Sequence, residues 1–600
     1  MNKIYDVLGN PPDDARLNIT RHTGTVYPIT RFRSREEVDS RREELRFNLR
    51  MAAGLYPWPE KTPLNTRLEP VGEFEGYTVH KIMFESYPGM WSTGNLYLPS
   101  PLPEKAPAIL NVIGHWANQR LHRDETADYP QQLANFARMG FVCLVTDMIG
   151  MVDSRQVSHH YGRDEKELWL SNGLGIQLWN NIRALDLLCS LPYVDANHIG
   201  MTGASGGGSQ TLFLALLDER VKAAAPINMI SLHMQGGCDC ENAPGLRRHT
   251  DNGEMCAMIA PRPLFLAGSD GDWTKYLETA ELPAMHETYR LYGAEHMVEH
   301  FYQSAPHQYN AKTRRRVYSF FARHLMGRET VWEEDPIETG DLQDFTWFRG
   351  EGHAEGFDCD ESYFAAHKTE LAARISALPR EEKRKMLGWM TDIRPDDYRL
   401  VPISQDTLGD TRIRRFLVCG EEGQRIPCVR LIPKNWDGKR VCLALGDQGK
   451  SCLDLPALRS MLEDGVALVS GDLLYTGESA ELPPRVSPAH TESPYYTLRH
   501  ITTFHNTPDA MRVQDASLLI RIAADMGELL TVWADGKAAR SVACALPLVH
   551  GVHSALLEAA AFDLPTEDAE YQKVLSIPGI RAFGGLKACL ELAACPVELF

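Results

Sequence analysis

The 600-residue chain has no stretch of about 18 consecutive apolar residues, which is the length that a membrane-spanning helix needs. It also has no long run of Lys or Arg: 62 basic residues stand against 80 acidic ones, for a net charge of −18. Because phosphate contacts require clustered positive charge, we expect neither a membrane nor a nucleic-acid partner. With 44% hydrophobic residues, the chain can form a folded core, which excludes a disordered protein.

The cysteines are too scattered to form a disulfide framework. They number 13, and several lie in apolar stretches, where a buried thiol is expected. The one close pair is Cys238 and Cys240, in GGCDCENA; a metal site needs two more ligands, and the nearest thiol, Cys256, has no partner pair. We therefore expect no metal and no cofactor.

The first residues, MNKIYDVLGNPPDD, lack the apolar run of a signal peptide. A cytoplasmic location is therefore the default expectation. A secreted form whose leader has been removed has the same appearance.

The length exceeds what one core usually organises, so at least two domains are expected. Between Glu329 and Glu361 the chain is acidic and contains Gly, which is typical of a linker, and a charged helix is predicted over Tyr363–Trp389. The predicted parts are a catalytic domain with an N-terminal helix at Arg35–Ala53 (1–330), an acidic linker and helix (331–395), and a second domain (396–600).

Both domains alternate short apolar runs with amphipathic stretches. Strand-like alternation starts at Tyr77, turns at residues 87–89 and resumes at Thr93, which predicts a β-hairpin. The runs AILNVIG (108–114) and FVCLVTD (141–147) have the length of buried parallel strands, and helical periodicity separates them. The order predicts an α/β fold with a mostly parallel sheet flanked by helices.

The two halves of the chain look related. FLVCGEEGQRIPCVRLIP follows the pattern of HKIMFESYPGMWSTGNLYLP, and each of these hairpins precedes a strand ending in Gly, VCLALG or AILNVIG. A helix with a Gln…Ile-Arg pattern then follows in each half, at Gln177 and at Gln514. We interpret this as an internal duplication, whose second α/β pattern starts near Thr411.

The motif that points most directly to chemistry is Gly203-Ala204-Ser205-Gly206-Gly207, a match to G-x-S-x-G. A strand-like run precedes it and a helix-like run follows, so Ser205 is expected on a tight turn that exposes its side chain as a nucleophile. The N–H groups of the following helix point toward developing negative charge. The alternative is a Gly-rich turn with an incidental serine.

A nucleophilic serine needs a base, and an acid that orients the base. In the chain order Ser, Asp/Glu, His, the base is His307, in SAPHQYN. The loop after the strand at 264–267 offers Asp270 and Asp272, and we favour Asp272. Glu241 is a further candidate for the acid or for a substrate contact.

The reaction also needs donors for an oxyanion. One is expected to be the N–H of Gly206, and the second the backbone N–H of Trp116 or His115, in the loop after AILNVIG. The side chains of His115, Trp169 and Trp273 are candidates for contacts to substrate, and the tryptophans could stack on a sugar ring. Packing in the core is the alternative for each.

These residues resemble a known family. The first half is similar to the acetyl-xylan-esterase-type branch of the α/β-hydrolases, related to cephalosporin-C deacetylases and glucuronoyl esterases. The resemblance spans residues 35–328 and rests on the SYPG hairpin with GNLYLP, on NVIGHW, TDMIGMVDSR, GASGGGSQT, CENAPGLR, APRPLFL…GDWTK and APHQYN. It implies serine-dependent hydrolysis of esters, often of acyl groups on plant polysaccharides, and supports Asp272 as the acid.

The second half resembles the same fold but departs from it at the site. Where the serine turn should fall, the chain reads VWADGKAARS, with Gly536 or Lys537 at the nucleophile position. The chain ends at CPVELF, which is similar to APRPLFL, before an acid or a histidine can follow. We interpret residues 396–600 as a truncated, non-catalytic α/β-hydrolase-like domain that packs on the first domain, binds glycan or mediates dimerisation.

Together these patterns predict two tandem α/β-hydrolase-like domains and one serine esterase site. The expected substrates are acyl esters, with acetyl the expected group, on carbohydrates such as xylan, cleaved through an acyl-enzyme. The alternatives are a glucuronoyl methylesterase, a peptidase of the prolyl-oligopeptidase type, which no propeller-like repeat supports, and a glycan-binding or scaffold protein with a vestigial site. The expected partner is the ester substrate, with a homodimer as one option for assembly.

Overall fold

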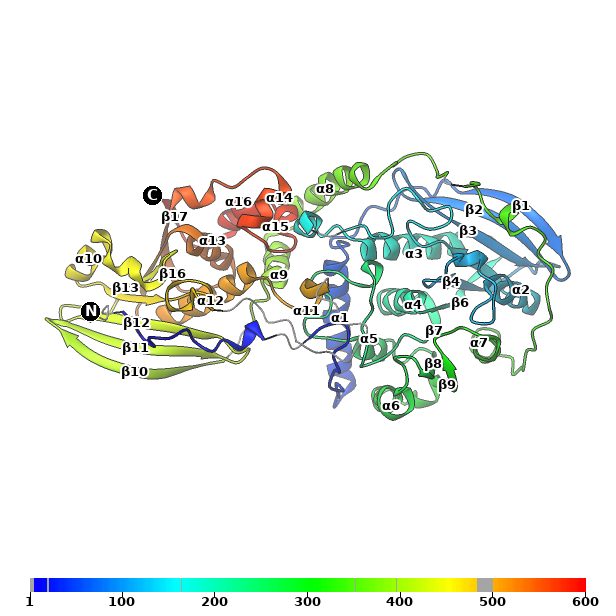
Figure 1. The fold of residues 1–600 in the computed structure, drawn as a ribbon, viewed down its shortest axis with the longest axis horizontal. Helices are drawn as coiled ribbons and strands as arrows, with labels where there is room; N and C mark the ends of the chain where they lie inside the picture. Colours follow the sequence, from blue (N-terminus) through cyan, green and yellow to red (C-terminus); the bar gives the residue numbers. More distant parts are fainter. Residues whose placement is uncertain (1–4, 19–20, 163, 351, 395–396, 483–499) are drawn as a thin grey trace.

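The structure is a computed structural model that describes residues 5–18, 21–162, 164–350, 352–394, 397–482 and 500–600. Its two halves lie side by side along the long axis, each built around one sheet, and helix α1 stands between them (Figure 1). α1 spans Arg35–Ala52, close to the predicted Arg35–Ala53. Its Leu45 and Leu49 pack in the core of the first half, whereas Phe47 and Met51 pack in that of the second.

Within the described ranges, no helix has both the length and the apolar character that crossing a membrane requires.

The first sheet has nine strands in the order β1-β2-β3-β5-β4-β6-β7-β8-β9. The first three strands form antiparallel pairs, β3 pairs antiparallel with β5, and the pairings from β5 to β9 are parallel. The strands are β1 (Arg67–Phe74), β2 (Tyr77–Tyr87), β3 (Met90–Pro99), β4 (Ala106–Val112), β5 (Val142–Thr146), β6 (Val194–Ala204), β7 (Val221–Ile227), β8 (Leu264–Gly271) and β9 (Val298–Pro306).

Helices cover both faces of this sheet. α2 and α7 pack on one face with Ile109 of β4, and α3 and α4 pack on the other face with Leu110. Because the central strands are buried on both faces, their sequences are continuous runs of apolar residues. The helices of this half after α1 are α2 (Tyr129–Met139), α3 (Gly173–Ser190), α4 (Gly206–Leu217), α5 (Asn252–Ala257), α6 (Leu282–Arg290) and α7 (Ala311–Met326).

The second sheet repeats the order of the first strand by strand, as β10-β11-β12-β14-β13-β15-β16-β17. Among the described residues, no strand of this sheet corresponds to β9. The predicted fold class, two tandem α/β-hydrolase-like domains, is thus confirmed. The strands are β10 (Tyr398–Leu408), β11 (Thr411–Gly420), β12 (Arg425–Pro433), β13 (Arg440–Leu445), β14 (Ala467–Gly471), β15 (Leu529–Ala534), β16 (Val552–Leu557) and β17 (Val597–Leu599).

Helices also flank the second sheet. α12 and α13 follow β14 and β15, as α3 and α4 follow β5 and β6, and they pack on one face with Leu443. α10 packs on the opposite face with Cys442. The helices are α10 (Pro456–Glu463), α11 (Ile501–Phe504), α12 (Pro508–Ala524), α13 (Gly536–Ala545), α14 (Asp568–Val574), α15 (Ile580–Phe583) and α16 (Gly585–Leu592).

Two details differ from the sequence-based expectation. The helix predicted over Tyr363–Trp389 is two helices, α8 (Asp360–Ser376) and α9 (Arg380–Thr391). Pro379 lies between them, and proline has no N–H to continue a helix. The outer strand β10 was not predicted, because nearly all of its residues are exposed and give no alternation of buried and exposed positions.

The N-terminal residues and the segment around α11 each pack on the half to which they do not belong in the sequence. Residues 5–17 lie on the second half: the N–H of Ala15 donates to Gly423 O, and Arg16 pairs with the buried Asp515 at 2.7 Å. These residues were predicted as part of the first domain (1–330), but they pack on the second half.

The segment around α11 belongs to the second half in the sequence but packs on the first half. The carbonyl groups of Thr502 and Thr503 accept hydrogen bonds from the N–H groups of Gly245 and Arg247. Phe504 is buried in a small apolar cluster with residues of the first half.

The acidic segment between the two α/β patterns packs on the first half. Trp332 Nε1 donates to Asn135 Oδ1 of α2 at 2.9 Å. The backbone N–H groups of Trp347 and Phe348 donate to the carboxylate of Asp153, at 2.9 and 3.2 Å.

Arg120 is the buried charge at the centre of these contacts. It is 1% exposed, and its guanidinium pairs with the buried carboxylates of Asp147 and Asp153. It also donates to Asn95 Oδ1 at 2.7 Å and to the carbonyl of Phe345 at 3.0 Å. One side chain thereby joins strand β3, the loop after β5 and the acidic segment.

Arg120→Met should lower the free energy of unfolding of the first half by about 3–5 kcal/mol, because it leaves two carboxylates buried without their cation. Urea titration followed by tryptophan fluorescence measures the change. Arg123→Met is the matched control: it removes a more exposed pair with Asp128, and we expect a loss below about 1 kcal/mol. Equal losses in the two variants would contradict the prediction.

Candidate active site

Ser205 occupies the turn between β6 and α4. Its backbone has φ 58° and ψ −125°, a conformation that residues with a side chain rarely adopt. The N–H of Ser205 donates to the carbonyl of Ile227 at the end of β7, at 3.1 Å. This strained strand–helix turn projects the serine from the carboxyl edge of the sheet, as the G-x-S-x-G pattern predicts.

The glycines on either side of Ser205 allow β4 to approach the turn. A methyl group at Gly203 would lie 2.4 Å from the carbonyl oxygen of Val112, and one at Gly207 would lie 2.5 Å from the same atom. Any larger residue at either position would therefore push β4 away from the serine turn.

The structure brings His307 and Asp272 together. His307 follows β9, Asp272 follows β8, and His307 Nδ1 lies 3.0 Å from Asp272 Oδ2. The Asp272 side chain is 1% exposed. Asp270 is exposed and instead accepts the N–H of Ala305 at 2.9 Å. The geometry therefore favours Asp272 as the partner of the imidazole.

Further donors fix the carboxylate of Asp272. Asn228 Nδ2 donates to Oδ2 at 2.8 Å, and the N–H of Thr274 donates to Oδ1 at 2.6 Å. Since an ionised carboxylate only accepts hydrogen bonds, His307 carries its proton on Nδ1, and Nε2 keeps its lone pair. This is the tautomer that a general base requires.

Two tryptophans hold the imidazole in place. The Trp273 ring lies 4.3 Å from that of His307, and the Trp116 ring stacks on it at 6.0 Å, with 15° between the planes. Trp116 in turn borders the serine: a methyl group at Gly114 would lie 2.6 Å from the Trp116 ring and 3.1 Å from Ser205 Cβ.

The hydrogen bond between base and nucleophile is not formed. His307 Nε2 has no hydrogen-bond partner among the described residues. Such bonds are often long in enzymes without substrate and tighten when substrate binds.

The structure changes the expectation for the oxyanion donors. The N–H of Trp116 donates to the carbonyl of Gly114 at 3.0 Å and is therefore already engaged. Within the described part of the chain, no acceptor is recorded for the N–H of His115. A methyl group at Gly206 would lie 2.6 Å from the His115 ring, so these two residues are in contact. His115, the open alternative, is the better second donor beside Gly206.

Two candidates for substrate contact lie elsewhere. Trp169 faces the second half, where its Nε1 donates to Asp568 Oδ1 at 2.9 Å. Glu241 is 3% exposed; its carboxylate accepts from Ser209 Oγ at 2.6 Å and from the N–H of Cys238 at 3.2 Å. These bonds hold the loop before α5, so neither the acid role nor the substrate role fits Glu241.

Sequence reasoning missed Asn228, which holds Asp272 in place. It follows β7 with φ 47°, a left-handed conformation that Asn tolerates better than most residues. An Asn directly after a buried strand, at the carboxyl edge of the sheet, was the available signal.

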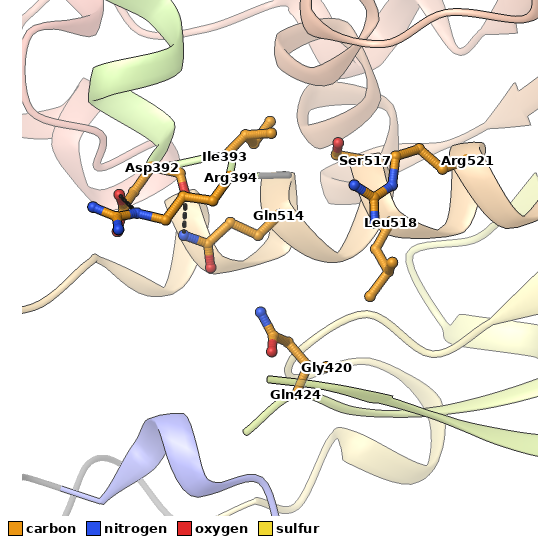
Figure 2. A pocket seen from close by; sticks show the side chains of 9 residues that line it. All are labelled: Asp392, Ile393, Arg394, Gly420, Gln424, Gln514, Ser517, Leu518 and Arg521. Atoms are coloured by element: carbon orange, nitrogen blue, oxygen red, sulfur yellow. Dashed lines mark hydrogen bonds and ion pairs between the residues drawn. The ribbon is translucent and has the colours of Figure 1, made fainter. Parts of the chain in front are cut away.

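A separate pocket lies in the second half, at the junction of α9, α12 and the β11–β12 turn (Figure 2). Arg394 reaches the carboxylate of Asp392 at 3.2 Å, and Gln514 donates to the Asp392 carbonyl at 3.3 Å (Figure 2). His249 also binds Asp392, at 2.8 Å. The acid is thereby engaged in contacts between the halves, and no predicted site residue lines this pocket.

In the second half, Gly536 stands at the position of Ser205. It begins the helix after β15 and has φ 49°, close to the 58° of Ser205. A glycine offers no nucleophile, as the sequence indicates.

Residues 59–231 match the model of the acetyl xylan esterase family (AXE1). The match includes Ser205 and ends before Asp272 and His307. The first half therefore contains a segment that is similar to acetyl xylan esterases, within a mostly parallel α/β sheet.

Relatives were found among curated proteins and solved structures. The curated protein "Putative hydrolase YtaP" of Bacillus subtilis (strain 168) is 24% identical over 225 residues, which cover 34% of this chain and 73% of the relative. The solved structure of Methylesterase BT1017 is 27% identical, with a TM-score of 0.45, and the alignment covers 57% of this chain and 78% of that one. A glucuronoyl esterase from Solibacter usitatus is 16% identical, with a TM-score of 0.37 and coverages of 50% and 94%.

Asp272→Asn should slow the labelling of Ser205 by a fluorophosphonate at least about 100-fold, because the amide cannot hold the His307 tautomer with a free Nε2. Asp270→Asn is the control, because its exposed carboxylate accepts the N–H of Ala305 in β9, and labelling should change little. Time-resolved mass spectrometry of the labelled protein measures both rates. A slower rate in Asp270→Asn alone would reverse the assignment of the acid.

Proposed function

We propose that the chain is a serine esterase that removes acyl groups, with acetyl the expected group, from carbohydrate esters. The observation that carries the proposal is the pairing of a strained serine turn with an oriented His307–Asp272 pair at one edge of an α/β sheet. The match of residues 59–231 to acetyl xylan esterases supports ester hydrolysis.

In this mechanism, Ser205 Oγ attacks the ester carbonyl while His307 Nε2 takes the serine proton. Asp272 stabilises the imidazolium through Nδ1. The N–H groups of Gly206 and His115 stabilise the oxyanion, helped by the N-terminal end of α4. His307 then gives its proton to the leaving sugar oxygen, and a water molecule activated by the same base releases the acyl group.

The surroundings of the loop after β4 support a sugar as the alcohol. A hollow beside this loop is lined by polar residues that include Asn118, Gln119, Arg155 and Gln343, together with apolar residues and one aromatic residue, Phe348; none of the three proposed triad residues lines it. Amide and guanidinium donors can bind sugar hydroxyl groups, and an aromatic ring can cover an apolar sugar face.

Ser205→Ala should lower kcat/KM on p-nitrophenyl acetate and on acetylated xylan at least about 1000-fold, because the acyl-enzyme can no longer form. The fold should be retained, as checked by circular dichroism. The control is Ser304→Ala, an exposed serine close to His307 in sequence, which should keep full activity. Full activity in Ser205→Ala would rule out the proposed nucleophile.

A substrate panel separates the related activities. The wild-type chain should hydrolyse acetylated xylan faster than methyl glucuronate esters or peptide anilides. Preference for the methyl ester would indicate a glucuronoyl methylesterase, and preference for the anilide would indicate a peptidase. Absence of fluorophosphonate labelling in the wild type would indicate a vestigial site.

A further inference from the structure

Four side chains with metal-binding atoms meet beside the serine turn, outside the proposed triad. His115 follows β4, His159 lies in the long loop after β5, and Cys238 and Cys240 flank the start of the turn Asp239–Glu241. One nitrogen or sulfur atom from each of the four lies within 4.8 Å of the others. The second histidine lies 79 residues from Cys238 in the sequence, so only the fold brings the ligands together.

The distances match a tetrahedral metal site. When two thiolates and two imidazoles bind one zinc ion, neighbouring ligand atoms are about 3.3–3.8 Å apart. Cys238 Sγ lies 3.2 Å from His159 Nε2, and Cys240 Sγ lies 3.4 Å from His115 Nε2. Sulfur and imidazole donors favour zinc over magnesium or calcium, which prefer oxygen.

The imidazole of His159 is already oriented as a ligand. Its Nδ1 lies 3.0 Å from the carbonyl of Ile149, and since a carbonyl only accepts, Nδ1 carries the proton. The lone pair of Nε2 therefore points toward Cys238, which is the usual arrangement around a bound metal. His159 and Cys240 are 7% and 1% exposed, so the protein encloses the site on the side where these two residues lie.

The loop that carries the thiols is also fixed. Glu241 Oε2 accepts the N–H groups of Gly237 and Cys238, both at 3.2 Å. The carboxylate of Glu241 therefore holds residues 237–241 in a conformation that presents both sulfur atoms to the two histidines.

We propose that His115, His159, Cys238 and Cys240 bind one zinc ion. Four protein ligands complete the tetrahedron, so the ion acts as a structural brace and leaves no position for substrate. It would tie the loops after β4, β5 and β7 to one another. Because His115 also contacts Gly206, the brace would hold the loop that supplies a proposed oxyanion donor. The proposal stands without the proposed function, because the ligands bind metal whatever reaction the serine performs.

The first test is the metal content of the full chain. Protein purified without chelators should contain about one zinc ion per chain by inductively coupled plasma mass spectrometry. The double variant Cys238→Ala/Cys240→Ala should lose at least about nine-tenths of it. The matched control, Cys189→Ala/Cys256→Ala, removes one half-buried and one buried thiol elsewhere in the first half and should keep its zinc. Zinc retained by the first double variant would overturn the proposal.

A second measurement on the unmutated chain covers the case in which the variant does not fold. After removal of zinc and addition of Co²⁺, the chain should show thiolate-to-cobalt charge-transfer absorption and the strong visible bands of a tetrahedral ion. His159→Ala should weaken these visible bands, since it removes one nitrogen ligand. Absence of the charge-transfer band, or a Cys238–Cys240 disulfide in the native protein found by intact mass, would overturn the zinc assignment.

Discussion

The ion triad of Arg120 with Asp147 and Asp153 is the interaction on which the candidate site depends. Three charges removed from water are tolerated only together, because loss of one partner leaves the others unpaired in a medium of low dielectric constant. Arg120 follows closely after His115 and Trp116, and Asp153 holds the acidic segment through two backbone N–H groups. The loop that lies against the serine turn is therefore held by these ion pairs as well as by the apolar packing of Trp116 and Leu121.

Sequence analysis predicted those residues of the candidate site whose positions depend on local structure. Ser205 was predictable because a strand, a glycine-flanked serine and a helix follow one another directly, and His307 because it precedes a helix in the required order. Which N–H group faces the oxyanion depends on a single turn at Gly114, which no pattern encodes. The contact of Trp169 with Asp568 could not be predicted, because an aromatic side chain carries no signal in the sequence for the face on which it lies.

The strand order of the second half was equally predictable, because buried strands and amphipathic helices repeat at the same intervals. Gly536, the first residue of α13, has a positive φ of 49°, close to the 58° of Ser205, and glycine adopts it without steric cost. The second half supplies the surface on which α1, α9 and residues 5–17 rest.

The segment around α11 bears on how the molecule is made. Phe504 fills a cluster with Tyr27 and Leu232, and Thr502 and Thr503 accept hydrogen bonds from the loop around Arg247. As the chain leaves the ribosome, the first half emerges long before these partners exist, so its loop beyond β7 waits in an incomplete state. The first half also contacts Asp568 and Gly579, still later in the chain, so its full set of contacts requires most of the second half to have been synthesised.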